Sequence, residues 1–120
     1  MKENIIKEKS FLFAIRIVKL YKFLSEERKE RVLSKQLLRS GTSIGANIRE
    51  ALNAQSSADF IHKCSIAQKE CDETLYWIEL LKETDYITET EFTSIYNDSN
   101  ELLKIIRSII LSTKQKNHNS

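Results

Sequence analysis

No proline occurs in these 120 residues, and the only two glycines, Gly41 and Gly45, stand four residues apart. They fall inside a stretch whose apolar residues recur with helical spacing, at Leu37, Ile44 and Ile48. Each glycine costs a helix interior about 1 kcal/mol relative to alanine. Close packing against another helix would offset that cost, because small residues let two backbones approach. We therefore predict one continuous helix with a close-packed face here.

The glycine stretch has two other interpretations. A turn at Gly41-Thr42-Ser43 would divide it into two short helices, although the apolar pattern runs through these residues without a break. A phosphate-binding loop requires Lys and then Ser or Thr directly after its second glycine. Ala46 and Asn47 occupy those positions, so the sequence argues against a nucleotide loop.

The composition favours one helical domain. Apolar residues make up 41% of the chain and charged residues 30%, and the length suffices for one core. Helices are expected at about residues 5–24, 35–53, 57–83 and 89–113, followed by a polar, frayed tail at 114–120. Short connections between four helices predict an all-α, antiparallel up-down-up-down bundle that occupies residues 1–120 as a single domain.

Helix starts are marked by capping residues. Ser34 is a plausible N-cap of the second helix. Ser56 with Asp59, and Thr88 with Glu91, match the capping-box spacing at the starts of the third and fourth helices.

The first expected helix has two apolar stripes. One stripe contains Phe11, Ile15, Val18 and either Tyr21 or Lys22. The other contains Phe13, Ile17, Leu20 and Leu24. One seam of a bundle needs one stripe. The second stripe therefore indicates either a subunit interface or deep burial within the same chain, and the sequence leaves both open.

Residues that could carry catalysis are sparse. Asp59 and His62 form one half of a di-metal motif that needs two Glu-x-x-His pairs. Cys64 and Cys71 lie about 10 Å apart along one helix, too far for a disulfide, and we expect both to be buried apolar residues. Asp72 follows Cys71 and opposes a thiolate there. We predict no catalytic residues, no metal and no cofactor.

Charge is unevenly distributed. Residues 1–49 contain 12 basic residues (Lys or Arg) and 5 acidic residues (Asp or Glu). Residues 50–101 contain 3 basic and 12 acidic residues, and residues 102–120 contain 4 basic and no acidic residues. One cluster of cations is a candidate contact surface for RNA or DNA: Lys19, Lys22, Arg28, Lys29, Arg31, Lys35 and Arg39. A solvated charged face is the alternative, since no nucleic-acid motif accompanies the cluster.

Polar residues near the apolar faces include Arg39, Asn47, Glu50, Glu73 and Tyr76. They predict a buried network that fixes helix register, or else a functional cleft. The first residues of the chain lack the apolar core of a signal peptide, and the apolar runs are too short to span a bilayer, so a cytoplasmic protein without membrane contact is expected.

Three blocks carry a family resemblance. SGTSIGANIREA, at residues 40–51, resembles the signature of the four-helix-bundle family also called the 23S rRNA intervening-sequence protein family. Residues 58–81 resemble its third helix, and residues 85–87 with residues 101–106 its fourth. Many members have proline where Gly45 stands, and Cys64 and Gln68 replace more usual apolar residues. The motif residues expected to be structural are Gly41, Ser43, Gly45, Asn47, Glu50, Glu73, Tyr76 and Trp77.

This resemblance implies a left-handed bundle of a bacterial type that assembles as a homopentamer. Some members are encoded inside 23S rRNA genes. The related accessory variability proteins of diversity-generating retroelements bind nucleic acid and a reverse transcriptase through a basic surface. The resemblance brings no agreed catalytic residues. We therefore expect a non-enzymatic oligomeric scaffold or adaptor that binds RNA or DNA, with a protein–protein interaction module as the alternative.

Overall fold

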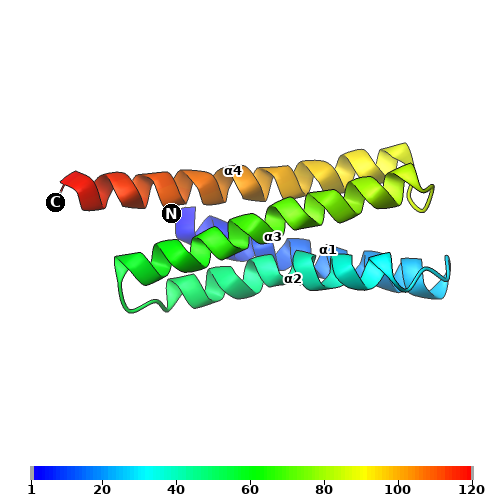
Figure 1. The fold of residues 1–120 in the computed structure, drawn as a ribbon, viewed down its shortest axis with the longest axis horizontal. Helices are drawn as coiled ribbons and strands as arrows, with labels where there is room; N and C mark the ends of the chain where they lie inside the picture. The colour runs from blue at the N-terminus through cyan, green and yellow to red at the C-terminus, as the bar shows by residue number, and fades with distance from the viewer. Residues whose placement is uncertain (1, 120) are drawn as a thin grey trace.

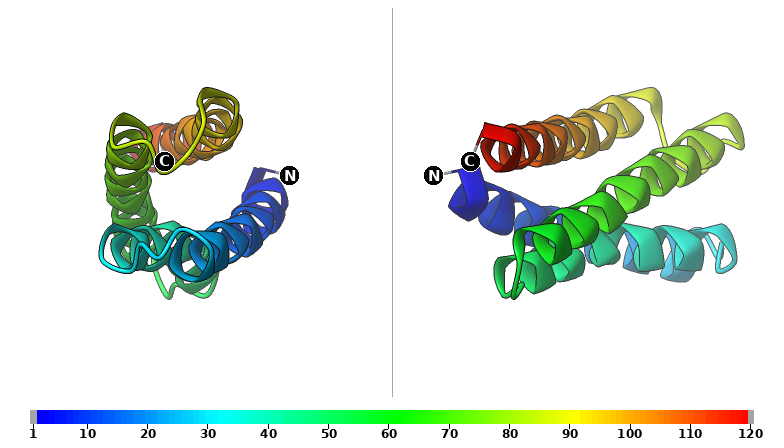
Figure 2. Two further views of the ribbon diagram at one scale, coloured as in Figure 1. Left: turned by 90° about the vertical axis from the view of Figure 1, so that its right-hand side faces the viewer. Right: turned by 60° about the vertical axis from the view of Figure 1, so that its left-hand side comes forward.

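Four α-helices follow one another in the structure, a computed structural model that describes residues 2–119: α1 (Lys2–Glu26), α2 (Leu33–Leu52), α3 (Ser57–Glu83) and α4 (Glu89–Asn119). Successive helices run in opposite directions (Figure 1). Viewed along the bundle, they stand in the order α1, α2, α3, α4 around a shared core (Figure 2). The all-α four-helix bundle is thereby confirmed, while its left-handed twist stays a prediction.

The two glycines lie in the middle of α2, and neither has a positive φ. A Cβ added at Gly41 would lie 2.7 Å from Cγ1 of Ile17, and one at Gly45 would lie 3.3 Å from the backbone oxygen of Ser10. Both contacts are with α1, so the glycines let α1 pack directly on the backbone of α2. The continuous helix is confirmed, and the alternative of a turn at Gly41 is wrong.

The core is built from the expected faces of α2, α3 and α4. Its fully buried members include Leu37, Ile44, Ile48, Ala67, Ile78, Leu81 and Ile106. Cys64 and Cys71 are free thiols within it, as expected. In α1, Phe13 and Ile17 are buried, whereas Phe11 and Ile15 of the other stripe are 51% and 39% exposed. One stripe therefore belongs to this core, and the other faces outward.

The start of α2 differs from the expectation. Ser34 is not the N-cap: it lies inside the helix, and its hydroxyl donates to the backbone oxygen of Glu30. The buried carboxylate of Glu30 instead accepts the N–H groups of Val32, Leu33 and Ser34, each at 2.9 Å. A carboxylate folded back from the connection satisfies three otherwise unpaired donors at the positive end of the helix dipole, more than one hydroxyl can.

The other two predicted starts are confirmed. The Ser56 hydroxyl accepts the N–H of Asp59, and Thr88 and Glu91 bond each other reciprocally at the start of α4. The predicted frayed tail is wrong for residues 114–119, which continue α4. Lysine and glutamine in this run have good helix propensity, which extends the helix beyond its last buried turn. Residue 120 lies outside the described part of the chain.

The seam between α1 and α4 is the looser side of the bundle (Figure 2). Long side chains cross it: Lys9 pairs with Glu101 at 3.0 Å, and Arg16 pairs with Asp98 and bonds Ser94, both at 2.7 Å. Part of the uneven charge in the sequence is thus matched within the molecule, because basic α1 faces acidic α4. Hollows of about 160 and 260 Å³ lie along this seam.

Candidate nucleic-acid interface

The basic cluster surrounds the connection from α1 to α2, at the end of the bundle where the α3–α4 connection also lies (Figure 1). We call five of its residues the loop-end surface: Lys19, Lys22, Lys29, Arg31 and Lys35. All five side chains are exposed, and the contacts of residues 2–119 include no ion pair for any of them. Their charge is therefore available to an external anion.

Arg28 has a structural role at this end. Its guanidinium donates to the backbone oxygens of Tyr86 and Asp85, at 2.8 and 3.0 Å, and lies 5.2 Å from the Tyr86 ring centroid. Arg28 thus joins the two connections. Lys29 next to it has a φ of 57°, a left-handed conformation that turns the chain toward α2.

Carboxylates in the same segment oppose the cations only in part. Glu26 and Glu27 are exposed, whereas Glu30 is buried and its oxygens are occupied by backbone donors of α2. The α1–α2 connection and its flanking turns therefore carry more available cations than exposed carboxylates. The exposed carboxylates Glu83, Asp85, Glu89 and Glu91 lie around the α3–α4 connection at the same end of the bundle.

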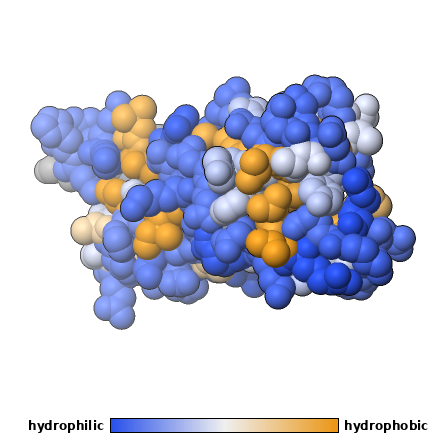
Figure 3. Space-filling model, turned by 45° about the vertical axis from the view of Figure 1, so that its right-hand side comes forward, coloured by the Kyte–Doolittle hydropathy of each residue, from blue (hydrophilic) through white to orange (hydrophobic). Residues whose placement is uncertain are grey.

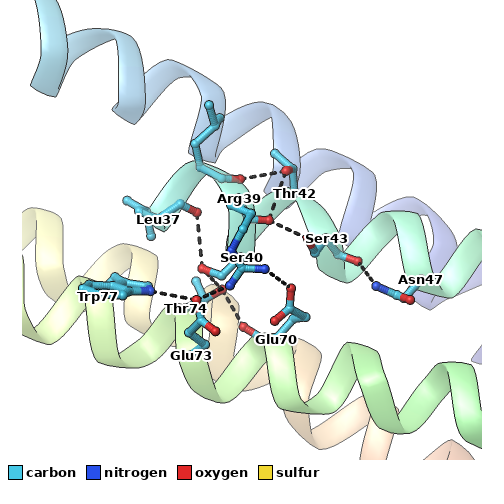
Figure 4. Close-up of polar contacts among 11 residues, drawn as sticks. Leu37, Arg39, Ser40, Thr42, Ser43, Asn47, Glu70, Glu73, Thr74 and Trp77 are labelled. Atoms are coloured by element: carbon cyan, nitrogen blue, oxygen red, sulfur yellow. Dashed lines mark hydrogen bonds and ion pairs between the residues drawn. The ribbon is translucent and has the colours of Figure 1, made fainter. Parts of the chain in front are cut away.

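Arg39, the seventh predicted contact, is held between α2 and α3 (Figure 4). It pairs with Glu70 at 2.8 Å and also with Glu73. The Trp77 indole donates to Glu73 at 3.0 Å. This bond, followed by Arg39, lowers the pKa of Glu73, and Glu73 and then Glu70 raise the pKa of Arg39. Arg39 links two helices and is not a free cation of the loop-end surface.

The remaining motif residues divide between the two helices. Ser43 and Asn47 bond backbone oxygens one turn earlier in α2, and Glu50 pairs with Lys63 of α3 at 2.9 Å. Tyr76 is exposed and lies edge-on to Trp77. The predicted polar cluster is therefore mostly a surface network across the α2–α3 seam.

The buried part of that network was missed from the sequence. Thr74 of α3 donates to Ser40 of α2 at 3.0 Å, and both are fully buried. Glu70 was also missed as a partner of Arg39, although it lies one turn before Glu73 on the same face of α3. The helical register alone could have indicated Glu70.

The outward stripe of α1 forms an apolar surface next to α2. Phe11 and Ala14 line a hollow of about 320 Å³ with Gly45, Ala46 and Arg49. The Arg49 guanidinium lies 5.1 Å from the Phe11 ring centroid. The side of the molecule shown in Figure 3 is largely hydrophilic and carries separate groups of hydrophobic side chains.

The thiols and acids offer little for catalysis. Burial raises the pKa of Cys64 to about 11 and that of Cys71 to about 12, so neither is a thiolate near neutral pH. Among residues 2–119, no group of three His, Cys, Asp or Glu side chains is placed to hold a metal. No helix in this part of the chain is both long and apolar enough to cross a bilayer.

The fold and these contacts define a small four-helix bundle with a cluster of exposed cations around the α1–α2 connection. Residues 2–108 match the model of the 23S rRNA-intervening sequence protein family, and the chain belongs to this family. A solved structure of a protein of unknown function from the S23 ribosomal protein family of Bacteroides thetaiotaomicron VPI-5482 is 64% identical, with a TM-score of 0.91. The match covers 92% of this chain and 98% of that one. A search of curated proteins gives no match.

Proposed function

We propose that the protein is a non-enzymatic scaffold or adaptor that binds RNA or DNA through the loop-end surface. The observation that carries this proposal is the set of five exposed cations that have no ion pair with any residue in 2–119. Lysine and arginine bind backbone phosphates and release condensed counterions, so affinity falls as salt rises. The rigid connection between the two loops, made by Arg28, would hold these cations in place.

The scaffold is proposed to be a homo-oligomer, a pentamer by family resemblance, located in the cytoplasm. Phe11 and Ile15 support self-association, because their exposed side chains form one stripe on the outside of α1. An oligomer would repeat the loop-end surface, and several weak phosphate sites would then act together. The two free thiols suit a reducing compartment.

Fluorescence anisotropy of a labelled structured RNA and a DNA duplex, titrated at two salt concentrations, tests nucleic-acid binding. The variant Lys22→Glu/Lys29→Glu/Lys35→Glu removes three loop-end cations and leaves Arg28 intact. Its control is Lys7→Glu/Lys104→Glu/Lys116→Glu, which changes the charge equally at other exposed positions. We expect salt-sensitive binding that only the loop-end variant loses. Equal losses in both variants, or no binding at low salt, would contradict the proposal.

The alternative function is a protein–protein interaction module without nucleic acid. The hollow beside Phe11 favours it, since an exposed aromatic next to an apolar depression is a common docking feature. Light scattering of wild type and of Phe11→Glu measures self-association through this surface. A mass of several protomers that falls in the variant supports a self-interface. A monomeric mass for both proteins would contradict the homo-oligomer. The exposed stripe of α1 would then be assigned to contact with a different protein.

A further inference from the structure

A hollow lined by two lysines lies between α3 and α4. Its residues belong to the start of α3 and the last turns of α4, at the end of the bundle opposite the α1–α2 connection (Figure 1). Its volume is about 360 Å³. Its lining consists of His62, Ser65, Ile66, Gln68, Lys69, Ile110 and Lys114. We call it the α3–α4 hollow. It includes Lys114 from the basic C-terminal block of the chain, whose cations are not part of the loop-end surface.

The side chains of this hollow suit an anion. Lys69 and Lys114 approach from different helices, and both are exposed without an ion pair among the described contacts. His62, Ser65 and Gln68 add hydrogen-bond donors, and no carboxylate lines the hollow. Glu70 follows Lys69 directly but pairs with Arg39 of α2, and Asp59 and Asp72 lie one turn from His62 and Lys69 along α3.

The floor of the hollow is apolar. Ile110 is buried, and Ile66 is partly buried. Two point charges beside neutral donors fit a ligand that carries phosphate groups. Arg107, two turns before Lys114, adds positive charge on the same face of α4, and residues 102–119 contain no Asp or Glu.

We propose that the α3–α4 hollow is a binding site for phosphate groups, contributed either by a nucleic-acid backbone or by a free polyphosphate. Lys69 and Lys114 supply the charge, and His62, Ser65 and Gln68 donate to phosphate oxygens. The site is separate from the loop-end surface, so it stands whether or not that surface binds nucleic acid.

Titration with labelled single-stranded RNA and, by calorimetry, with sodium tripolyphosphate tests the site. Lys69→Ala/Lys114→Ala removes both lysines, and Gln68→Glu places a carboxylate in the hollow as a second variant. The matched control, Lys7→Ala/Lys104→Ala, removes two exposed lysines outside it. Helix content measured by circular dichroism verifies that every variant is folded. The loop-end triple variant is titrated with both ligands in parallel.

We expect both hollow variants to weaken binding of at least one ligand about tenfold, with the control unchanged. For RNA binding to Lys69→Ala/Lys114→Ala, the slope of log affinity against log salt should become shallower by about 1.4. Each of the two lost phosphate contacts on a single strand accounts for about 0.7 of that slope. If the hollow variants bind tripolyphosphate more weakly than wild type, the ligand of the hollow can be a free anion. If only their affinity for RNA is reduced, the ligand is a nucleic-acid backbone. The proposal is overturned by unchanged affinity in the hollow variants, or by equal loss in the control. Tripolyphosphate binding retained in the loop-end variant separates the two surfaces.

Discussion

Helix α1 contacts its two neighbours by different means. Toward α2 it packs on a backbone exposed by Gly41 and Gly45, with Ile17 filling the space that a Cβ would occupy. Toward α4 it reaches across with Lys9 and Arg16, whose partners are carboxylates at the surface. The α1–α2 seam therefore depends on two positions without side chains, and the α1–α4 seam depends on long charged side chains that reach across it.

This difference determines how each seam should respond to change. Close-packed interiors tolerate little added volume, because neighbouring atoms have no room to move. Exposed ion pairs contribute little, because water screens them and ordering long side chains costs entropy. Substitutions on the α2 side should therefore be severe and insensitive to salt, and those on the α4 side mild and sensitive to it.

The largest effect is expected from Gly41→Leu. Its Cβ alone would lie 2.7 Å from Ile17, so the substitution should lower the free energy of unfolding by about 3 kcal/mol or more. Thermal melting of this variant and of Ala46→Leu, an exposed position of the same helix, gives the comparison. Adding Ile17→Ala should recover part of the loss. A melting temperature equal to that of wild type would refute close packing at Gly41.

Glu30→Ala removes the carboxylate that holds the start of α2 against the end of α1. Loss of three backbone hydrogen bonds should reduce stability by about 1–2 kcal/mol, the cost of losing a strong helix cap. Urea denaturation measures the change, and Glu27→Ala, an exposed neighbour, serves as control. Equal stability of the two variants would show that the Glu30 carboxylate does not hold α2.

Reversing both cations on the α4 side, by Lys9→Glu/Arg16→Glu, places like charges across the open seam. We expect a loss of about 1 kcal/mol at low salt that shrinks at high salt, as for other exposed pairs. Adding Asp98→Arg/Glu101→Lys restores opposite charges and should restore stability. A larger loss that salt leaves unchanged would mean that this seam is packed as tightly as the other.

The smallest effect is expected from Glu73→Gln on the α2–α3 seam. Trp77, and then Arg39, lower the pKa of Glu73, so its stabilising contribution is present above the unfolded value near 4.5 and is lost as pH falls through the folded value. The difference in melting temperature between wild type and Glu73→Gln should therefore be present at pH 7 and shrink as the pH falls below 4.5. Glu79→Gln, an exposed carboxylate on α3, is the control. A difference that does not change as the pH falls would assign the effect to packing.

Much of the fold was accessible from the sequence, because helix existence follows from apolar spacing. The apolar spacing indicated the continuous helix around the glycines and the α3 face around Cys71, and the capping-box spacing indicated the Thr88–Glu91 cap. The Glu30 cap was missed because a carboxylate that folds back from a connection leaves no periodic signal. Helix α4 continues beyond its predicted end because the residues of the polar run favour a helix, although they form no apolar stripe.

The candidate site was less accessible, since a cluster of cations in sequence does not reveal which are already paired. Arg28 and Arg39 belonged to the predicted surface, and both bind within the molecule. Pairing depends on residues that lie far away in sequence, such as Tyr86 and Glu70. The α3–α4 hollow depends in the same way on the packing of helices whose lysines are 45 residues apart, at Lys69 and Lys114.

The ion pairs across the open seam also bear on the order of folding. Lys9–Glu101 and Arg16–Asp98 join residues 92 and 82 positions apart, whereas the other seams connect helices adjacent in sequence. Long loops close late, because their entropy must be lost before any contact forms. We therefore expect the helical hairpins to assemble first and the α1–α4 seam to close last. Substitutions of the residues that form the α1–α4 seam should then give φ-values near zero. In native-state hydrogen exchange, the backbone amides along this seam should exchange before those of the other seams.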